Sequence, residues 1–149
     1  MLNIRKAVPA DAPAIAGFQV SMALETEQLI LDKPTVIKGV EALFTDPSKG
    51  NYYVAESDEG VVASLLITYE WSDWRNGTVI WIQSVYVIPG YRRRGVYSKL
   101  YSHVKQMVLD DKNLKGIRLY ADKMNHSAQK AYKKLGMNAD HYITFEWLK

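Results

Sequence analysis

The most informative part of the sequence reads Val85-Tyr86-Val87-Ile88-Pro89-Gly90-Tyr91-Arg92-Arg93-Arg94-Gly95-Val96-Tyr97. It joins two elements that the pattern predicts clearly. One is a strand of β-branched and aromatic residues over 78–87, which Pro89-Gly90 ends, and the other is a helix over 96–109. The loop between them is basic and contains glycine. Loop amides and a helix N-terminus both present N–H groups to an anion, so this junction predicts an anion site that suits a diphosphate.

Two common phosphate-binding motifs do not fit this loop. Gly90 and Gly95 have the spacing of a Walker loop, but Val96-Tyr97 stands where that loop needs Lys followed by Ser or Thr. The dinucleotide fingerprint G-x-G-x-x-G is absent from the chain. The three arginines could also form an ordinary solvated loop, and the run alone does not decide between these readings.

The order of the other elements predicts the fold class. Helices are expected to open at Asp11 and near Pro34, and a further helix is expected over 127–135. Strands are expected around Leu2 and Ile4 and over 52–56, 61–69, 117–121 and 142–147. The resulting order, β-α-α-β-β-β-α-β-α-β, places one strand–helix–strand crossover in a mostly antiparallel sheet. We therefore predict a mixed α/β, or α+β, fold with helices on both faces of the sheet.

Length and composition limit the function classes. The chain has 149 residues, of which 48% are hydrophobic, and this predicts a single globular domain over 1–149. The absence of cysteine excludes disulfides, thiolate metal sites and a cysteine nucleophile. The net charge of +3 suits an anionic ligand but is too small to argue for nucleic acid. The start lacks the apolar region of a signal peptide and no apolar run approaches the ~20 residues of a membrane span, so we expect a cytoplasmic protein.

Two segments resemble motifs of the GNAT superfamily of N-acetyltransferases. Arg92 and Gly95 match the first two fixed positions of its motif A, [R/Q]-x-x-G-x-[G/A], while Tyr97 replaces the usual Gly or Ala. Residues 125–137 resemble motif B, with Asn125, a helix, Tyr132 and the closing Gly136. The expected order of elements matches the GNAT fold over essentially the whole chain.

The resemblance implies acetyl-CoA as co-substrate. Main-chain groups of the strand would bind the pantetheine arm, and the loop amides would bind the pyrophosphate. The implied cofactor-binding residues are Val85, Tyr86, Val87, Arg92, Arg93, Arg94, Gly95, Val96, Tyr97 and Asn125.

Tyr132 matches the family tyrosine that donates a proton to the departing thiolate. A tyrosine hydroxyl has a pKa near 10 and a thiol near 8.5, so the transfer needs no perturbed group. The alternative is that Tyr132 is a half-buried helix tyrosine that only packs. Without cysteine, direct attack by the amine in a ternary complex is the expected mechanism.

The acceptor side is less defined. Some relatives carry a carboxylate on the long strand, where this chain has Gln83-Ser84. A base acting through water could instead be one of four residues, which the sequence does not rank: Glu25, Glu27, Glu70 and Asp73. We expect the acceptor to be held by Glu25 and Glu27, in the connection between the first two helices, and by Trp71 and Trp74 of the facing hairpin. The alternative is that Glu25 and Glu27 are solvated residues at a helix end and that Trp71 and Trp81 belong to the core.

The sequence thus predicts an acetyl-CoA-dependent N-acetyltransferase acting on a primary amine of a small molecule, peptide or protein. The alternatives are a non-catalytic acyl-CoA-binding module and a nucleic-acid-binding domain that uses Arg92 to Arg94. The three histidines show no metal-ligand spacing, so we expect no metal. We expect neither nucleic acid nor a membrane as partner, and a homodimer stays open.

Overall fold

The structure, a computed structural model, describes all residues from 1 to 149. The chain forms two compact units, Met1–Arg118 and Leu119–Lys149, and each is described by itself. The elements of the first unit are β1 (Asn3–Lys6), α1 (Ala12–Glu27), α2 (Lys33–Thr45), β2 (Asn51–Ser57), β3 (Gly60–Ser72), β4 (Gly77–Val87), α3 (Val96–Asp110) and β5 (Leu114–Arg118). The second unit contains α4 (His126–Lys134).

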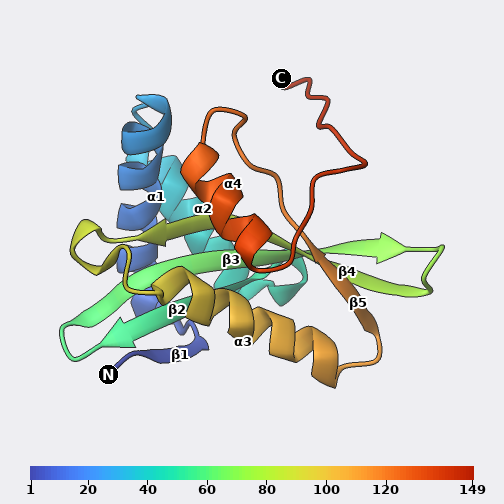
Figure 1. Cartoon of the computed structure of the whole chain (residues 1–149). Helices are drawn as coiled ribbons and strands as arrows, with labels where there is room; N and C mark the ends of the chain where they lie inside the picture. Colours follow the sequence, from blue (N-terminus) through green and yellow to red (C-terminus); the bar gives the residue numbers. More distant parts are fainter. The chain divides into compact units, whose positions relative to one another are not determined.

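The first unit is built on one five-stranded sheet with the strand order β1-β2-β3-β4-β5. The pairs β1–β2, β2–β3 and β3–β4 are antiparallel. The last pair, β4–β5, is parallel, and α3 supplies the crossover between these two strands (Figure 1). A parallel pair needs such a crossover, whereas the antiparallel pairs need only turns. The predicted mixed α+β fold is confirmed.

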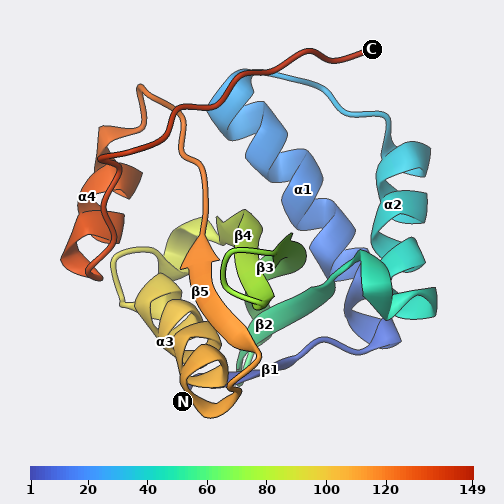
Figure 2. The same ribbon diagram turned by 90° about the vertical axis from the view of Figure 1, so that its right-hand side faces the viewer.

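Helices cover both faces of the sheet. On β2, the side chain of Val54 packs in a buried cluster with residues of α1 and α2, whereas the ring of the preceding residue, Tyr53, lies 5.2 Å from that of His103 on α3. Because successive strand residues point to opposite faces, α1 and α2 lie on one side of the sheet and α3 on the other (Figure 2). Fully buried side chains such as Ile15 and Leu65 fill the two interfaces. Burying each one contributes ~1.5–3 kcal/mol.

The ladder between β3 and β4 contains a bulge at Ser84. Ser64 pairs with Tyr86 and Leu66 pairs with Gln83, so one β3 residue faces two β4 residues. The backbone of Ser84 has φ 51°, in the left-handed region that residues other than glycine seldom adopt. Bulges of this kind interrupt pairing and turn backbone groups away from the ladder, and they are frequent beside functional sites.

Three sequence-based expectations need correction. The predicted C-terminal strand over 142–147 is absent, because its alternating pattern supplies strand propensity but no neighbouring strand pairs with it. The strand expected over 117–121 lies earlier, as β5, because its register with β4 runs from Leu114 to Arg118. Glu25-Thr26-Glu27 forms the last turn of α1 and not a connection, since the helix continues until Gln28 adopts a left-handed conformation with φ 53°.

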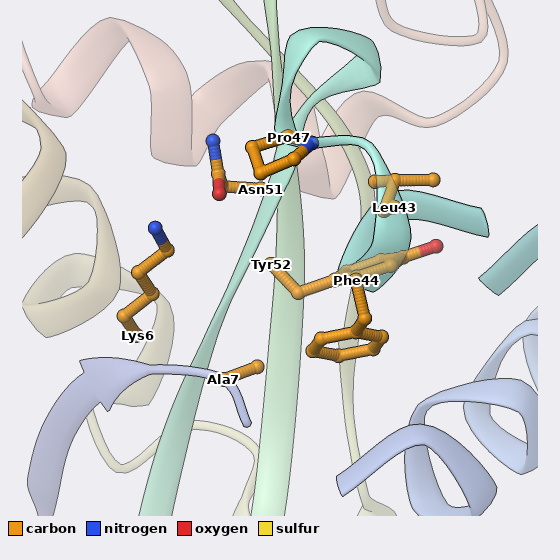
Figure 3. A pocket seen from close by; sticks show the side chains of 7 residues that line it. All are labelled: Lys6, Ala7, Leu43, Phe44, Pro47, Asn51 and Tyr52. Atoms are coloured by element: carbon orange, nitrogen blue, oxygen red, sulfur yellow. The ribbon is translucent and has the colours of Figure 1, made fainter. Parts of the chain in front are cut away.

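A small pocket lies at the edge of the first unit, near the C-terminal end of α2. Its lining includes Lys6 beside β2 and the stacked rings of Phe44 and Tyr52, whose centroids are 6.2 Å apart (Figure 3). No residue of the loop that follows β4 lines it. No helix of the structure combines the length and the apolar character needed to cross a membrane.

Candidate functional site

The loop after β4 presents backbone amides in the arrangement that anions bind. After Val87 the chain makes a single 3-10 turn over Pro89–Tyr91 and then reaches α3 at Val96. Arg93 and Gly95 both have positive φ, 61° and 72°. No side chain caps the N-terminus of α3, so its first amides receive no hydrogen bond acceptor from a capping residue. Alternating left-handed residues followed by a helix N-terminus form a concave set of N–H donors.

Gly95 is the N-cap residue of α3 and is suited to its conformation. Its φ of 72° strains residues that carry a Cβ, while glycine adopts it freely. A Cβ built at this position meets no atom within 4 Å. The requirement for glycine is therefore conformational, and the space beside the backbone stays open on this side of the loop.

Arg92, the first residue of the basic run, makes contacts with two other parts of the first unit. Its Nε donates a hydrogen bond of 2.8 Å to the carbonyl oxygen of Val87. Its Nη2 donates to Oε2 of Glu25 in α1 at 2.7 Å. The guanidinium also lies 5.4 Å from the ring centre of Tyr86. These contacts join the end of β4, the loop and the last turn of α1.

Glu25 and Tyr86 complete this group. The buried Tyr86 donates its hydroxyl proton to Oε1 of Glu25 at 2.9 Å, and its ring packs 5.3 Å from that of Phe18 on α1. The hydrogen bond from Arg92, followed by the one from Tyr86, holds the pKa of the Glu25 carboxyl below its usual value. Burial, followed by the hydrogen bond to Glu25, raises the pKa of Tyr86. At neutral pH, Glu25 is therefore an ionised carboxylate and Tyr86 is a protonated phenol.

The side chains of Arg94 and Tyr97 contact other aromatic residues. The Arg94 guanidinium lies 5.3 Å from the ring centre of Tyr91, whose hydroxyl donates to Glu59 at 2.9 Å. The ring of Tyr97 lies 6.4 Å from that of Tyr101, one helical turn later. The side chain of Tyr97 therefore packs along α3. Only the backbone of Tyr97 faces the loop.

The tryptophans expected beside the acceptor lie at the other end of β4. Trp71 pairs with Thr78, and Trp74 lies in the turn between β3 and β4; both side chains are exposed. Thr78 precedes Tyr86 by eight residues on β4, or ~26 Å of extended strand. The structure thus brings Glu25, Tyr86 and Arg92 together but does not bring Trp71 or Trp74 to them.

The other candidate carboxylates also have partners. Glu70 accepts a hydrogen bond from Nε1 of Trp81 at 2.8 Å and forms an ion pair with Arg118 at 2.6 Å. The hydrogen bond from Trp81, together with Arg118, keeps the pKa of Glu70 below its usual value. Asp73 accepts a hydrogen bond from the amide of Trp74 in the turn. Glu27, the last residue of α1, is exposed.

Comparison with known proteins identifies the family. The model of the acetyltransferase (GNAT) family matches residues 21–137, which include the loop and the helix α4. The chain belongs to the GNAT family of acetyltransferases. The resemblance of its two motifs to this family is confirmed.

Two solved structures are similar to this chain. A protein from Clostridium difficile 630, described as a possible acetyltransferase, has a solved structure with a TM-score of 0.93 and 42% identity; the match covers 100% of this chain and 98% of that one. A predicted acetyltransferase from Clostridium acetobutylicum, solved with acetyl-CoA, has the same fold, with a TM-score of 0.75 and 19% identity, over 98% of this chain and 96% of that one.

A bovine relative is named for its acceptor. The thialysine N-epsilon-acetyltransferase of Bos taurus is 36% identical over 76 residues, which are 51% of this chain and 44% of that enzyme. The match therefore spans just under half of the bovine protein.

The two GNAT motif B residues lie in the second unit. Asn125 is the N-cap residue of α4, and its side-chain oxygen accepts a hydrogen bond from the amide of Ala128 at 3.1 Å. This capping role explains an asparagine at this position without reference to a ligand. Tyr132, on α4, is half-buried, and burial raises the pKa of its hydroxyl.

Sequence reasoning missed two features of this candidate site. The first is the contact of Glu25 with Tyr86 and Arg92, since residues 61 and 67 positions apart give no local signal of pairing. The second is Ser64, which pairs with Tyr86 beside the bulge and whose buried hydroxyl has no hydrogen-bond partner among the protein atoms. A lone serine within an apolar strand was its only sequence signal.

Proposed function

We propose that the chain is an acetyl-CoA-dependent N-acetyltransferase that transfers the acetyl group to a primary amine of a small molecule or peptide. The observation that carries this proposal is the uncapped N-terminus of α3, which follows Arg93 and Gly95 in left-handed conformations at the motif A positions. Such a set of amides suits a pyrophosphate, and the open space beside Gly95 allows close approach to the backbone. GNAT acetyltransferases use acetyl-CoA, which supplies the acetyl group as an activated thioester.

The residues of this chain would then divide the work of binding. The amides of residues 93–97 would hold the pyrophosphate, assisted by the charges of Arg92, Arg93 and Arg94. Backbone groups of Val85, Tyr86 and Val87, next to the bulge, would orient the pantetheine arm. A backbone N–H released from the ladder at the bulge is a suitable donor for a carbonyl oxygen that gains negative charge. Asn125 is proposed to assist from the start of α4.

The reaction needs two proton transfers, and each is assigned to a different residue. Tyr132 would hold a proton at its hydroxyl oxygen for the departing thiolate, and a raised pKa keeps that proton in place at neutral pH. An alkylamine with a pKa near 10.4 is neutral in only about one molecule in 2,500 at pH 7, so the acceptor must also lose a proton. Glu25, ionised at neutral pH, is our candidate to receive it through water.

The acceptor is proposed to approach the last turn of α1. This turn carries Glu25 and Glu27 and no basic residue. The C-terminal end of a helix has a partial negative charge, which adds to that of the two carboxylates and favours a cationic amine. The name of the bovine relative makes thialysine and lysine the first acceptors to examine. The lack of cysteine suits a reducing compartment, and a cytoplasmic location is part of the proposal.

The test is turnover with the purified full chain. Acetyl-CoA is mixed with a panel of amines that includes thialysine, lysine, short diamines and peptides with free N-termini, and release of free CoA thiol is measured. We expect at least one amine to increase thiol release far above hydrolysis. Binding of acetyl-CoA in a thermal-shift assay without turnover on any amine would favour the non-catalytic acyl-CoA-binding module.

A further inference from the structure

Glu25 occupies a position that is unfavourable by the rules of helix formation. It lies in the last turn of α1 with Glu27, where no basic residue is present. The partial negative charge of a helix C-terminus favours cations there and disfavours carboxylates. A local violation of this kind is expected where function requires it. The cation that compensates it comes from a distant part of the chain, as Arg92.

Arg92 is also the first residue of the anion-binding loop. One edge of its guanidinium is bonded to Val87 and Glu25. An anion bound by the amides of residues 93–97 would lie near the same charge and would attract it. Glu25 and a diphosphate are therefore rival partners for one guanidinium.

The ion pair is weak enough to exchange. The side chains of Arg92 and Glu25 are 44% and 39% exposed, so water screens their attraction. Ion pairs of this exposure stabilise proteins little, whereas a diphosphate offers two negative groups to the loop. The carboxylate of Glu25 also has a second anchor, because the hydroxyl of the buried Tyr86 bonds to its other oxygen. Glu25 can lose Arg92 and remain in place.

We propose that a diphosphate bound at the loop competes with Glu25 for Arg92, and that the carboxylate so released is the group that meets a cationic acceptor. The second part rests on the proposed acetyltransferase function. Glu25 then has two alternative cationic partners, Arg92 and the amine, and Tyr86 keeps the carboxylate oriented in both cases. Occupation of the loop by the diphosphate strengthens the binding of the amine without any large movement of the backbone.

The first experiment compares ligand affinities of the full chain and two charge-matched variants. Glu25→Gln keeps an oxygen that accepts from Tyr86 but removes the competing charge, while Glu27→Gln removes the same charge two residues away. We expect Glu25→Gln to tighten acetyl-CoA binding by about two- to fivefold, the range of an exposed ion pair. Its affinity for acetyl-pantetheine, which lacks the diphosphate, should not change, and Glu27→Gln should alter neither affinity appreciably.

The second experiment observes Glu25 directly and uses inorganic pyrophosphate as the probe. In protein labelled with carbon-13 at the glutamate carboxyls, the resonance that Glu25→Gln removes is assigned to Glu25. We expect pyrophosphate to shift this resonance in the wild type and acetyl-pantetheine not to shift it.

Two results overturn the inference. One is weaker acetyl-CoA binding by Glu25→Gln, which would make Glu25 a fixed clamp of the loop. The other is a Glu25 resonance that pyrophosphate leaves unchanged. Failure of the proposed function is separate: the pyrophosphate shift would be present, but no amine would be acetylated.

Discussion

The hydroxyl of Tyr86 donates a hydrogen bond of 2.9 Å to the carboxylate of Glu25, which lies 61 residues earlier in the chain. This bond joins the strand that leads into the loop, where we propose that the diphosphate binds, to the helix end where we place the acceptor. Tyr86 is buried and Glu25 is partly exposed, so the strand orients the carboxylate while leaving it accessible to solvent. One hydrogen bond thus connects the proposed cofactor region with the proposed acceptor region.

Removal of this hydroxyl is expected to affect both stability and acceptor binding. Tyr86→Phe keeps the ring against Phe18 but loses the hydrogen bond, so the free energy of unfolding should fall by about 1 kcal/mol in urea titrations. The KM for the amine should rise because Glu25 loses an anchor. Tyr91→Phe, which removes a hydroxyl bonded to the exposed Glu59, is the control and should change stability less. An unchanged amine KM in Tyr86→Phe would contradict the positioning role.

The ion pair of Asp11 with Arg5 predicts a pH dependence of stability. Arg5 donates to the buried Asp11 at 2.7 Å, and this hydrogen bond lowers the pKa of Asp11 from its usual 3.8. A lowered carboxyl pKa stabilises the fold at every pH above 3.8, and the stabilisation is lost as the pH falls through the folded-state value. Asp11→Asn should therefore cost about 2 kcal/mol at neutral pH.

Urea unfolding of the wild type and Asp11→Asn at a series of pH values tests this. The difference between the two should stay constant from pH 7 to about 4 and shrink below that. Glu56, which also accepts a hydrogen bond from Arg5, is present in both proteins, so its contact with Arg5 is common to the two curves. If the difference in free energy of unfolding grew on acidification, the pKa of Asp11 would be raised in the folded protein and not lowered.

The backbone conformation of Gly95 gives a graded prediction for the loop. Gly95→Ala meets no neighbouring atom but must adopt a φ of 72°, at a cost of roughly 1–2 kcal/mol. Asn tolerates this region better, so Gly95→Asn should lose less stability and less acetyl-CoA affinity than Gly95→Ala, and Gly95→Val should lose most of all. Tyr97→Gly, next to the same loop, should affect cofactor affinity less than Gly95→Val. Isothermal titration with acetyl-CoA would contradict this if Gly95→Val bound as tightly as the wild type.

Features of the fold that depend on neighbouring residues could be predicted from the sequence, whereas features that depend on distant contacts could not. The loop and its flanking elements could be predicted because a strand end, a glycine and a helix start are all local features within 85–97. The group of Glu25, Tyr86 and Arg92 could not, since it depends on how α1 packs on β4. The bulge at Ser84 carried no glycine to indicate it. The segment 142–147 had the alternation of a strand, but a strand forms only where a partner pairs with its backbone.

Replacement of Ser64 tests whether its buried hydroxyl has a structural or a functional role. A buried polar group without a partner costs stability, so Ser64→Ala should be neutral or stabilising by up to about 1 kcal/mol in urea titrations. Ser64 lies opposite Tyr86, beside the bulge, where the thioester is proposed to bind. If the variant is more stable but transfers acetyl groups more slowly, the hydroxyl serves the reaction. Equal turnover would restrict its role to filling space in the strand.

The last prediction concerns Tyr132, the proposed proton donor. Tyr132→Phe keeps the ring on α4 and removes the proton held at a hydroxyl whose pKa burial raises. A positioned acid accelerates proton transfer by about 10²–10⁴-fold, so turnover should fall within that range while acetyl-CoA affinity stays within twofold. The loss should diminish with thioesters of more acidic thiols, because such leaving groups need no proton. Tyr120→Phe, another tyrosine of the same unit, serves as the control and should retain turnover. A fall in thermal stability that explained the lost turnover would instead make Tyr132 a packing residue, and full turnover in Tyr132→Phe would transfer the proton-donating role to water.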